Sequence, residues 1–248
     1  MDARLRRLDV GMAARALADL VMPRTCIVCD RDLILQEDHI CLACLADLPL
    51  TYYETLARNP MSERVNAILE RDAVAYQPYV LATALYFYAG AYRHISPQLK
   101  YGRRFGDGRF FARMLGERLA GSDLFCDVDC VIPVPLHPWR RWQRGYNQAE
   151  IIARELARCL PGARVDARAL CRRRRTRTQV RLGSEAKWRN VAGAFALRRG
   201  APAGRHLLVV DDVCTTGATL AACIRALRAV LPDDVKISVA TLAVVGNS

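Results

Sequence analysis

The segment from Leu207 to Thr219 constrains the fold of this chain more than any other part of the sequence. Four apolar residues, Leu207–Val210, are typical of a buried strand, and two carboxylates, Asp211 and Asp212, follow at once. A Thr-Thr-Gly turn then enters a stretch whose apolar residues recur at helical spacing. A strand, a polar turn and a helix in this order indicate an α/β sheet, whose ligands bind at the carboxyl ends of the strands.

The turn after the two aspartates has the features of a phosphate site. Exposed backbone N–H groups, threonine hydroxyls and the N-terminus of the following helix can together bind an anion. A glycine at position 217 lets the backbone approach that anion without a Cβ in the way. An acid pair beside a phosphate site suits a sugar phosphate with free cis-hydroxyls. The alternative is an aspartate pair that only caps a helix.

The rest of the second half of the chain alternates between strand and helix patterns. Asn147-Gln148-Ala149-Glu150 is a capping-box pattern that opens a helix, which Pro161-Gly162 ends. The other expected strands are 81–88, 128–134 and 235–245, and the other expected helices are about 91–99, 109–119 and 219–231. This alternation predicts a parallel sheet covered by helices on both faces.

Four of the ten cysteines form two Cys-x-x-Cys pairs near the start of the chain. Cys26 and Cys29 are separated from Cys41 and Cys44 by eleven residues, a spacing that lets two tight turns surround one tetrahedral ion. Zinc is the ion favoured by softness and geometry, and four thiolates would make it structural. A redox pair needs only one such motif. His39 is the rival ligand.

The formal net charge of the 248 residues is +12, and it is carried almost entirely by arginine. Guanidinium suits phosphates, although an Arg- and Ala-rich genome is the simpler explanation for much of the bias. Eight basic residues against one acid, Glu185, lie between Arg172 and Asn190. No apolar run approaches the length of a membrane span, and residues 3–21 are interrupted by charge, so we expect a cytoplasmic protein without membrane insertion.

The Leu207–Thr219 segment is similar to the 5-phosphoribosyl 1-pyrophosphate (PRPP) signature of type I phosphoribosyltransferases. The resemblance implies that Asp211 and Asp212 hold the ribose hydroxyls and act as catalytic residues. It also implies that the residues after them wrap the 5′-phosphate. These residues are Cys214, Thr215, Thr216, Gly217, Ala218 and Thr219.

Further motifs resemble the ComF family, which joins a zinc-ribbon-like head to a phosphoribosyltransferase-like domain. They are Leu99-Lys100-Tyr101-Gly102, Pro133–Pro138, Arg144–Gln148, Thr178-Gln179, Arg189-Asn190 and the cysteine quartet, so the resemblance covers about 23–245. It implies a type I phosphoribosyltransferase-like fold in residues 81–248, after an N-terminal helix and four-cysteine zinc-binding module in 1–50. Residues 51–80 are polar, lack strong periodicity and contain Asn59-Pro60 and Gln77-Pro78, so we expect a linker there. Many ComF-like chains have a second cysteine quartet after the first. The 51–80 stretch of this chain has none, so we expect one zinc ion.

The same resemblance implies Mg²⁺-dependent transfer of phosphoribosyl from PRPP to an unknown nitrogen acceptor. Lys100 and Arg144, with Arg140 and Arg141 nearby, would neutralise the pyrophosphate. The Arg172–Arg189 segment matches the mobile loop that covers such sites, although Lys187 stands where an arginine is expected.

Two other functions remain open at this point. One is a catalytically silent accessory protein of DNA uptake that binds single-stranded DNA, for which the Arg172–Arg189 segment would be a nucleic-acid contact. The other is a PRPP-sensing regulator. For the transferase itself, the resemblance implies a role in DNA uptake by competent bacteria or in nucleotide salvage. Competence-machinery proteins are the partners that a role in DNA uptake implies.

Overall fold

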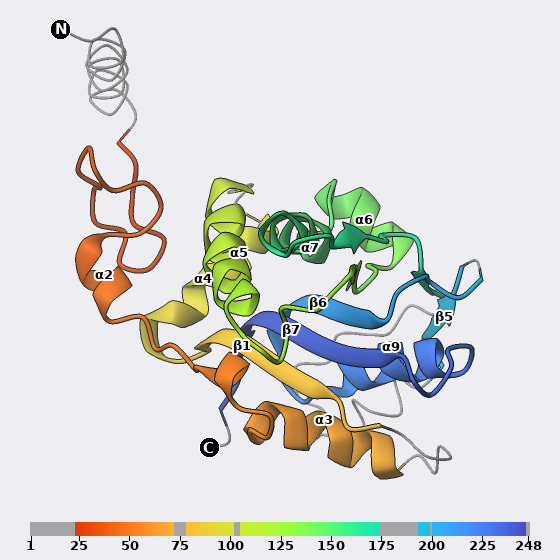
Figure 1. Ribbon diagram of the computed structural model, residues 1–248. Helices are drawn as coiled ribbons and strands as arrows, with labels where there is room; N and C mark the ends of the chain where they lie inside the picture. Colours follow the sequence, from red (N-terminus) through yellow and green to blue (C-terminus); the bar gives the residue numbers. More distant parts are fainter. Residues whose placement is uncertain (1–22, 72–77, 102–104, 174–192, 199, 247–248) are drawn as a thin grey trace, which may run out of the picture.

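The computed structural model describes residues 23–71, 78–101, 105–173, 193–198 and 200–246 (Figure 1). Residues 3–21, expected to form a helix, and most of the Arg172–Arg189 segment lie outside this part of the chain. Within the described residues, no helix is both long and apolar enough to cross a lipid bilayer.

A five-stranded sheet with the order β1-β7-β6-β2-β3 forms the centre of the molecule. Each neighbouring pair is parallel, which confirms the expected α/β architecture. The strands are β1 (Leu81–Phe87), β2 (Cys130–Pro133), β3 (Arg164–Val165), β6 (His206–Cys214) and β7 (Lys236–Val244). A separate antiparallel pair, β4 (Leu170–Arg172) and β5 (Phe195–Leu197), leads into and out of the arginine-rich segment.

Helices cover both faces of the sheet, as the sequence pattern predicts. Helices α5 (Phe105–Ala120) and α7 (Gln148–Cys159) lie on one face, and α3 (Pro60–Arg71) and α9 (Ala218–Arg228) lie on the other (Figure 1). Along β6, Leu207 and Val209 are buried in one apolar cluster, whereas Leu208 and Val210 are buried in the other. Burial on both faces explains why the strand is an uninterrupted apolar run.

The stretch 51–80 differs from the linker that its polar composition predicts. It contains α3, whose Met61, Val65 and Leu69 are buried in the core. Its polar residues bond to the start of β1, on the edge away from β7: the Asn66 side chain exchanges two hydrogen bonds of 2.9 Å with the Val80 backbone, and Asn59 Nδ2 donates to Ala82 O at 2.8 Å. Further along the same edge, Leu50 pairs with Tyr86 in an antiparallel bridge. Because these bonds satisfy the backbone at the sheet edge, the segment is part of the folded domain.

Shorter elements complete the described fold. They are α2 (Leu42–Ala46), η1 (Tyr53–Thr55), η2 (Gly90–His94), α4 (Ile95–Tyr101) and α6 (Pro138–Arg144). The helix expected at 91–99 is thus divided into η2 and α4. Asn147 caps α7 as predicted, since its Oδ1 accepts from Ala149 N, but Glu150 pairs with Arg141 and Arg154 instead of closing the capping box.

A buried histidine joins the amino ends of the two central strands. His206 is 1% exposed, and its ring nitrogens lie 2.6 Å from Asp127 Oδ1 and 2.7 Å from Ser238 Oγ. Burial lowers the pKa of His206 below its ordinary value, although the bond to Asp127 opposes that shift. The folded state therefore holds a neutral imidazole, whereas the unfolded chain takes up a proton near the ordinary pKa of about 6.5.

We expect acid to destabilise the fold through His206. Because the unfolded state binds the extra proton, the free energy of unfolding should fall below about pH 6.5, by at most about 1.4 kcal/mol per pH unit from this group. Urea titrations between about pH 7.5 and 5.5 measure the slope. His206→Gln, which does not titrate, should show a shallower slope than the wild type, and equal slopes would contradict the assignment.

Candidate functional site

The central strand β6 extends beyond its neighbour β2. Its pairing with β2 ends at Pro133↔Val210, whereas its pairing with β7 continues to Cys214↔Val244. The chain leaves β2 toward β3 and leaves β6 toward β7, in opposite directions across the sheet. In open α/β sheets ligands bind at such a switch point, outside the carboxyl ends of the two strands, and we call this region the crevice. Asp211 and Asp212 lie at this crevice.

The two carboxylates belong to opposite faces of the sheet, because β6 continues through both and its side chains alternate. Asp212 is 8% exposed, and Ser96 Oγ of α4 donates to its Oδ2 at 2.9 Å. Asp211 is half-buried on the α9 face, where it adds to the effect of burial in raising the pKa of Cys223. The apolar run in the sequence predicts a strand that ends at Val210, so it does not predict that the two carboxylates lie on opposite faces.

The loop between β6 and α9 presents the N-terminus of an eleven-residue helix to the crevice. Thr215 is exposed, and the Oγ1 of half-buried Thr216 accepts from Ala218 N at 3.4 Å. Cys214 is 1% exposed, and burial raises the pKa of its thiol to about 12, so it is a neutral packing group. The first N–H groups of α9 have no partner within the helix and suit an anion.

Gly217 has two structural roles besides the approach to an anion that the sequence suggests. It caps α9 in the left-handed region, at φ +82°. A Cβ at this position would lie 3.3 Å from Val65 Cγ2 of α3. The glycine therefore permits both the backbone conformation and the close packing of α3 behind the loop.

Arg64 of α3 supports the same loop from behind. Its Nη1 donates to the backbone carbonyls of Thr215 and Val245, the latter at 3.0 Å. Sequence reasoning missed this residue because it lies in the segment predicted as a linker. The contact fixes the loop through its backbone and leaves the threonine hydroxyls available for other partners.

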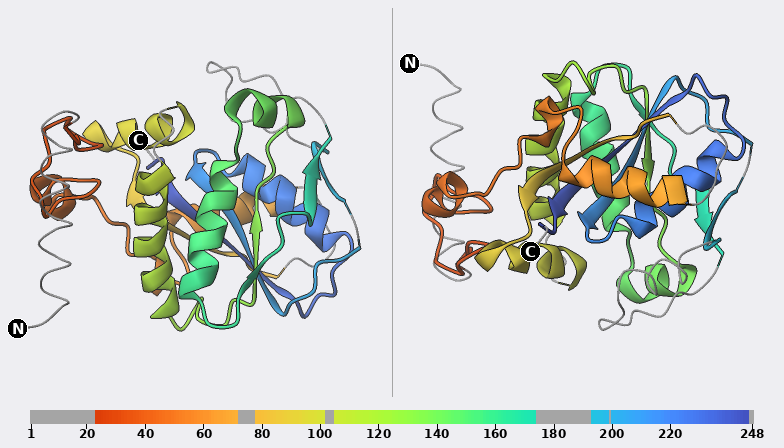
Figure 2. Two further views of the ribbon diagram at one scale, coloured as in Figure 1. Left: turned by 90° about the horizontal axis from the view of Figure 1, so that it is seen from above. Right: turned by 90° about the horizontal axis from the view of Figure 1, so that it is seen from below.

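On the other side of the crevice, the chain leaves the sheet after Val134, forms α6, and comes back beside Val134 at Asn147, which begins α7. The Asn147 side chain closes this excursion by donating to Val134 O at 3.0 Å. His137 caps α6, since its Nδ1 accepts from Trp139 N at 3.3 Å. Figure 2 shows α6 (green) and α4 (yellow) along the same edge of the molecule.

The residues expected to bind pyrophosphate lie on these two helices. Arg144 ends α6, is half-buried, and lies 3.5 Å from Gln148 Oε1. Arg141 pairs with Glu150 at 3.3 Å. Lys100 lies in the last turn of α4, and its side chain is outside the described part of the structure. The OH group of Tyr146, two residues after Arg144, donates to Leu99 O and so joins the two segments.

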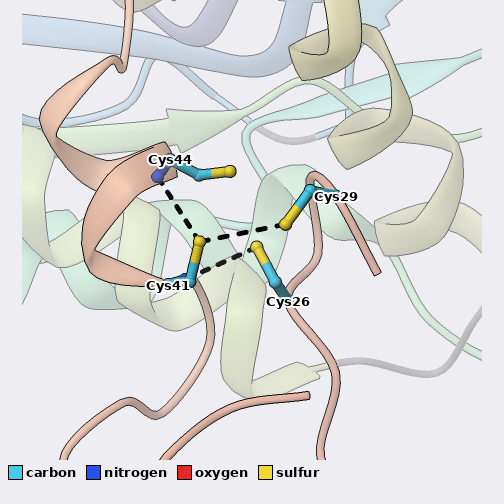
Figure 3. A group of neighbouring side chains, drawn as sticks. All are labelled: Cys26, Cys29, Cys41 and Cys44. Carbon is cyan, nitrogen blue, oxygen red and sulfur yellow. Dashed lines mark hydrogen bonds between the residues drawn. The ribbon is translucent and has the colours of Figure 1, made fainter. Parts of the chain in front are cut away.

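A second candidate site lies in the N-terminal module. Figure 3 shows Cys26, Cys29, Cys41 and Cys44 pointing toward one centre, and their sulfur atoms all lie within 4.8 Å of one another. Backbone N–H groups of Val28 and Cys41 each donate to Cys26 Sγ at 3.4 Å. Burial opposes ionisation of Cys26, but such backbone bonds prevail and lower its pKa to about 7. Four thiol groups arranged in this way fit a tetrahedral zinc ion.

His39, the rival ligand, has another role in the structure. Its Nδ1 lies 2.6 Å from Asp107 Oδ1 of α5, and its ring centroid lies 5.3 Å from that of Phe110. The missing Cβ of Gly106 makes room for the ring, since an added Cβ would lie 2.8 Å from His39 Cε1. His39 therefore attaches the cysteine module to the α/β domain.

Comparison with known proteins agrees with this architecture. Residues 144–246 match the family model of the phosphoribosyl transferase domain. The chain is 38% identical over 130 residues to DNA utilization protein YhgH of Escherichia coli O6:H1, covering 50% of this chain and 55% of that protein. It is 33% identical over 111 residues to competence protein F of Haemophilus influenzae, covering 44% and 48%. The chain thus spans about half the length of the curated relatives it matches.

The parallel sheet, the acid pair and the phosphate-type loop, together with the family match, define a phosphoribosyltransferase-like protein. Its relatives and its cysteine module support the resemblance to the ComF family that the sequence motifs carry.

We expect Cys26→Ser to abolish zinc binding and to destabilise the N-terminal module, because a structural metal site contributes folding free energy. Zinc per chain, measured by atomic emission, should fall from about one to near zero, with a lower thermal midpoint. Cys126→Ser is the matched control, since Cys126 is an exposed free thiol outside the cluster. Full zinc content and an unchanged midpoint in Cys26→Ser would exclude the site.

Proposed function

We propose that the carboxyl edge of the sheet binds PRPP with Mg²⁺ and that the protein transfers phosphoribosyl to a nitrogen nucleophile. The observation that carries this proposal is the position of Asp211 and Asp212 at the switch point, directly before the N-terminus of α9. A sugar phosphate needs carboxylates that accept hydrogen bonds from its hydroxyls and, next to them, a site for its phosphate.

Each part of PRPP has a suitable counterpart in the described residues. The N–H groups at the start of α9 and the hydroxyls of Thr215 and Thr216 suit the 5′-phosphate. Asp212, held by Ser96, suits the ribose hydroxyls, and Asp211 borders the same loop from the other face. Arg144 and Lys100 belong to the two segments that flank the crevice and suit the pyrophosphate.

The donor set also fits magnesium, which prefers one or two carboxylates together with phosphate oxygens. When bound, Mg²⁺ would neutralise charge on the pyrophosphate. The chain itself contributes positioning and electrostatic stabilisation: the loop at 215–219 fixes the phosphate end of the sugar, and Asp212 orients the ring. Arg144 then opposes the negative charge that develops on the leaving group.

Titration calorimetry with PRPP tests the binding step directly. We expect Mg²⁺-dependent binding by the zinc-loaded protein. Asp212→Asn should weaken it roughly ten- to a hundredfold, because it removes a charged acceptor of hydrogen bonds. Asp234→Asn, at an exposed position of the turn before β7, is the control. Absence of PRPP binding by the folded wild type would refute the proposal.

Turnover separates a transferase from a PRPP sensor. A transferase releases pyrophosphate when the correct nitrogen acceptor is added, whereas a sensor binds PRPP without releasing it. The printed names of the relatives concern DNA utilization and competence. We propose on this ground that the protein acts in the uptake or use of DNA, in the cytoplasm.

A specific surface favours a second function, the binding of single-stranded DNA. On α6, Trp142 is 83% exposed and Trp139 is 44% exposed, and Arg141 and Arg144 lie on the same short helix. Exposed aromatic rings next to arginines bind unpaired bases by stacking and hold the phosphates by charge.

Trp142→Ala should therefore weaken the binding of a fluorescent oligothymidylate about five- to a hundredfold, as expected for the loss of one stacked base. Trp142→Phe should retain most of the affinity because it keeps an aromatic face. Wild-type affinity should also fall steeply with added salt. Fluorescence anisotropy measures all three effects, and equal affinities of Trp142→Ala and the wild type would exclude this surface.

A further inference from the structure

We propose that Ser96 is a positioning residue for Asp212 and that the segment Gly90–Tyr101 links the ligand site to the cysteine module, so that metal in the module sustains ligand affinity. The proposal rests on the proposed function only in assigning ligand binding to Asp212. No part of the proposed reaction requires such a link.

The first step is the contact between Ser96 and Asp212. Ser96 is 3% exposed and lies in the first turn of α4, and its hydroxyl donates to Asp212 Oδ2 at 2.9 Å. The carboxylate of Asp212 is itself 8% exposed and lies close to the buried Tyr86 of β1. Burial raises the pKa of Tyr86, and the charge of Asp212 adds to that shift. In such surroundings a hydrogen bond to a charged group fixes its orientation strongly. Ser96 thus determines which way Asp212 faces.

The second step is a contact four residues earlier in the same segment. Tyr92 of η2 donates from its OH group to the backbone carbonyl of Cys44 at 2.9 Å. Cys44 is one of the four clustered cysteines. A metal held by its sulfur would hold its backbone too, and hence the acceptor of the Tyr92 bond. One short segment therefore contacts the cysteine cluster at Tyr92 and the site carboxylate at Ser96.

Packing makes this segment rigid. Ile95 and Leu99 are 0% and 5% exposed and belong to the same buried cluster as Ile27 and Ile40 of the cysteine module. Close-packed interiors transmit displacements rather than absorb them. A change in the position of the module is therefore passed to α4.

The same helix also reaches the opposite side of the crevice. Leu99 O accepts from Tyr146 OH, in the turn between α6 and α7. Lys100, which we assign to the pyrophosphate, is the next residue. Loss of metal from the module should thus weaken ligand binding, and by linkage a bound ligand should strengthen the retention of the metal.

Titration calorimetry of the zinc-loaded full chain with Mg²⁺ and PRPP tests both contacts. Ser96→Ala should weaken affinity about tenfold, corresponding to the loss of one hydrogen bond to a charged group, and Ser96→Thr should restore most of it. Tyr92→Phe should weaken affinity about threefold while zinc stays near one per chain. Tyr79→Phe is the matched control, since Tyr79 OH contacts Ser62 and Glu63 on α3. Wild-type affinity in Ser96→Ala or Tyr92→Phe would overturn the proposal.

Hydrogen exchange without PRPP provides a second, independent measurement. We expect zinc removal by a chelator, and likewise Tyr92→Phe in the loaded protein, to accelerate amide exchange in 90–101 and at the carboxyl end of β6, relative to 148–159 in α7. Unchanged exchange in 90–101 would overturn the coupling. A wild type that shows this coupling but does not bind PRPP would refute the proposed function and leave the link between module and carboxylate intact.

Discussion

The pairing of β6 with β7 beyond the end of β2 is the constraint on which the site depends. It keeps residues 211–214 in strand conformation, with one flank open to the crevice, and it places α9 directly after them. Because the strand continues, Asp211 and Asp212 face opposite sides of the sheet: Asp212 is held by Ser96 of α4, and Asp211 lies on the α9 side. The anion site and the acid pair are thus parts of one continuous segment of backbone.

Supports for this segment come from parts of the chain far away in sequence. Arg64 and Gly217 join α3 to the loop, and Ser96 joins α4 to Asp212. Each contact consists of one or two hydrogen bonds or a close approach, and each depends on the tertiary fold. No local pattern predicts them, which is why sequence reasoning assigned 51–80 to a linker and overlooked both Arg64 and Ser96.

Local patterns succeeded where the backbone itself carries the signal. The apolar run before Asp211, the cap at Asn147 and the two Cys-x-x-Cys turns each gave elements or clusters that the structure confirms. They failed where polar residues serve the fold rather than solvent. Asn59 and Asn66 bond to the backbone at the edge of the sheet, so the polar composition of 51–80 wrongly predicted a linker. His39 attaches the module to Asp107, so the histidine that the sequence offers as a rival metal ligand has a structural role instead.

A crystal structure of the zinc-loaded protein grown with PRPP and Mg²⁺ tests the central claim most directly. The account predicts the 5′-phosphate on the backbone N–H groups of 215–219, with the ribose hydroxyls against Asp212 and the pyrophosphate between α4 and α6. A fully occupied ligand elsewhere on the molecule, with the loop before α9 bare, would contradict it.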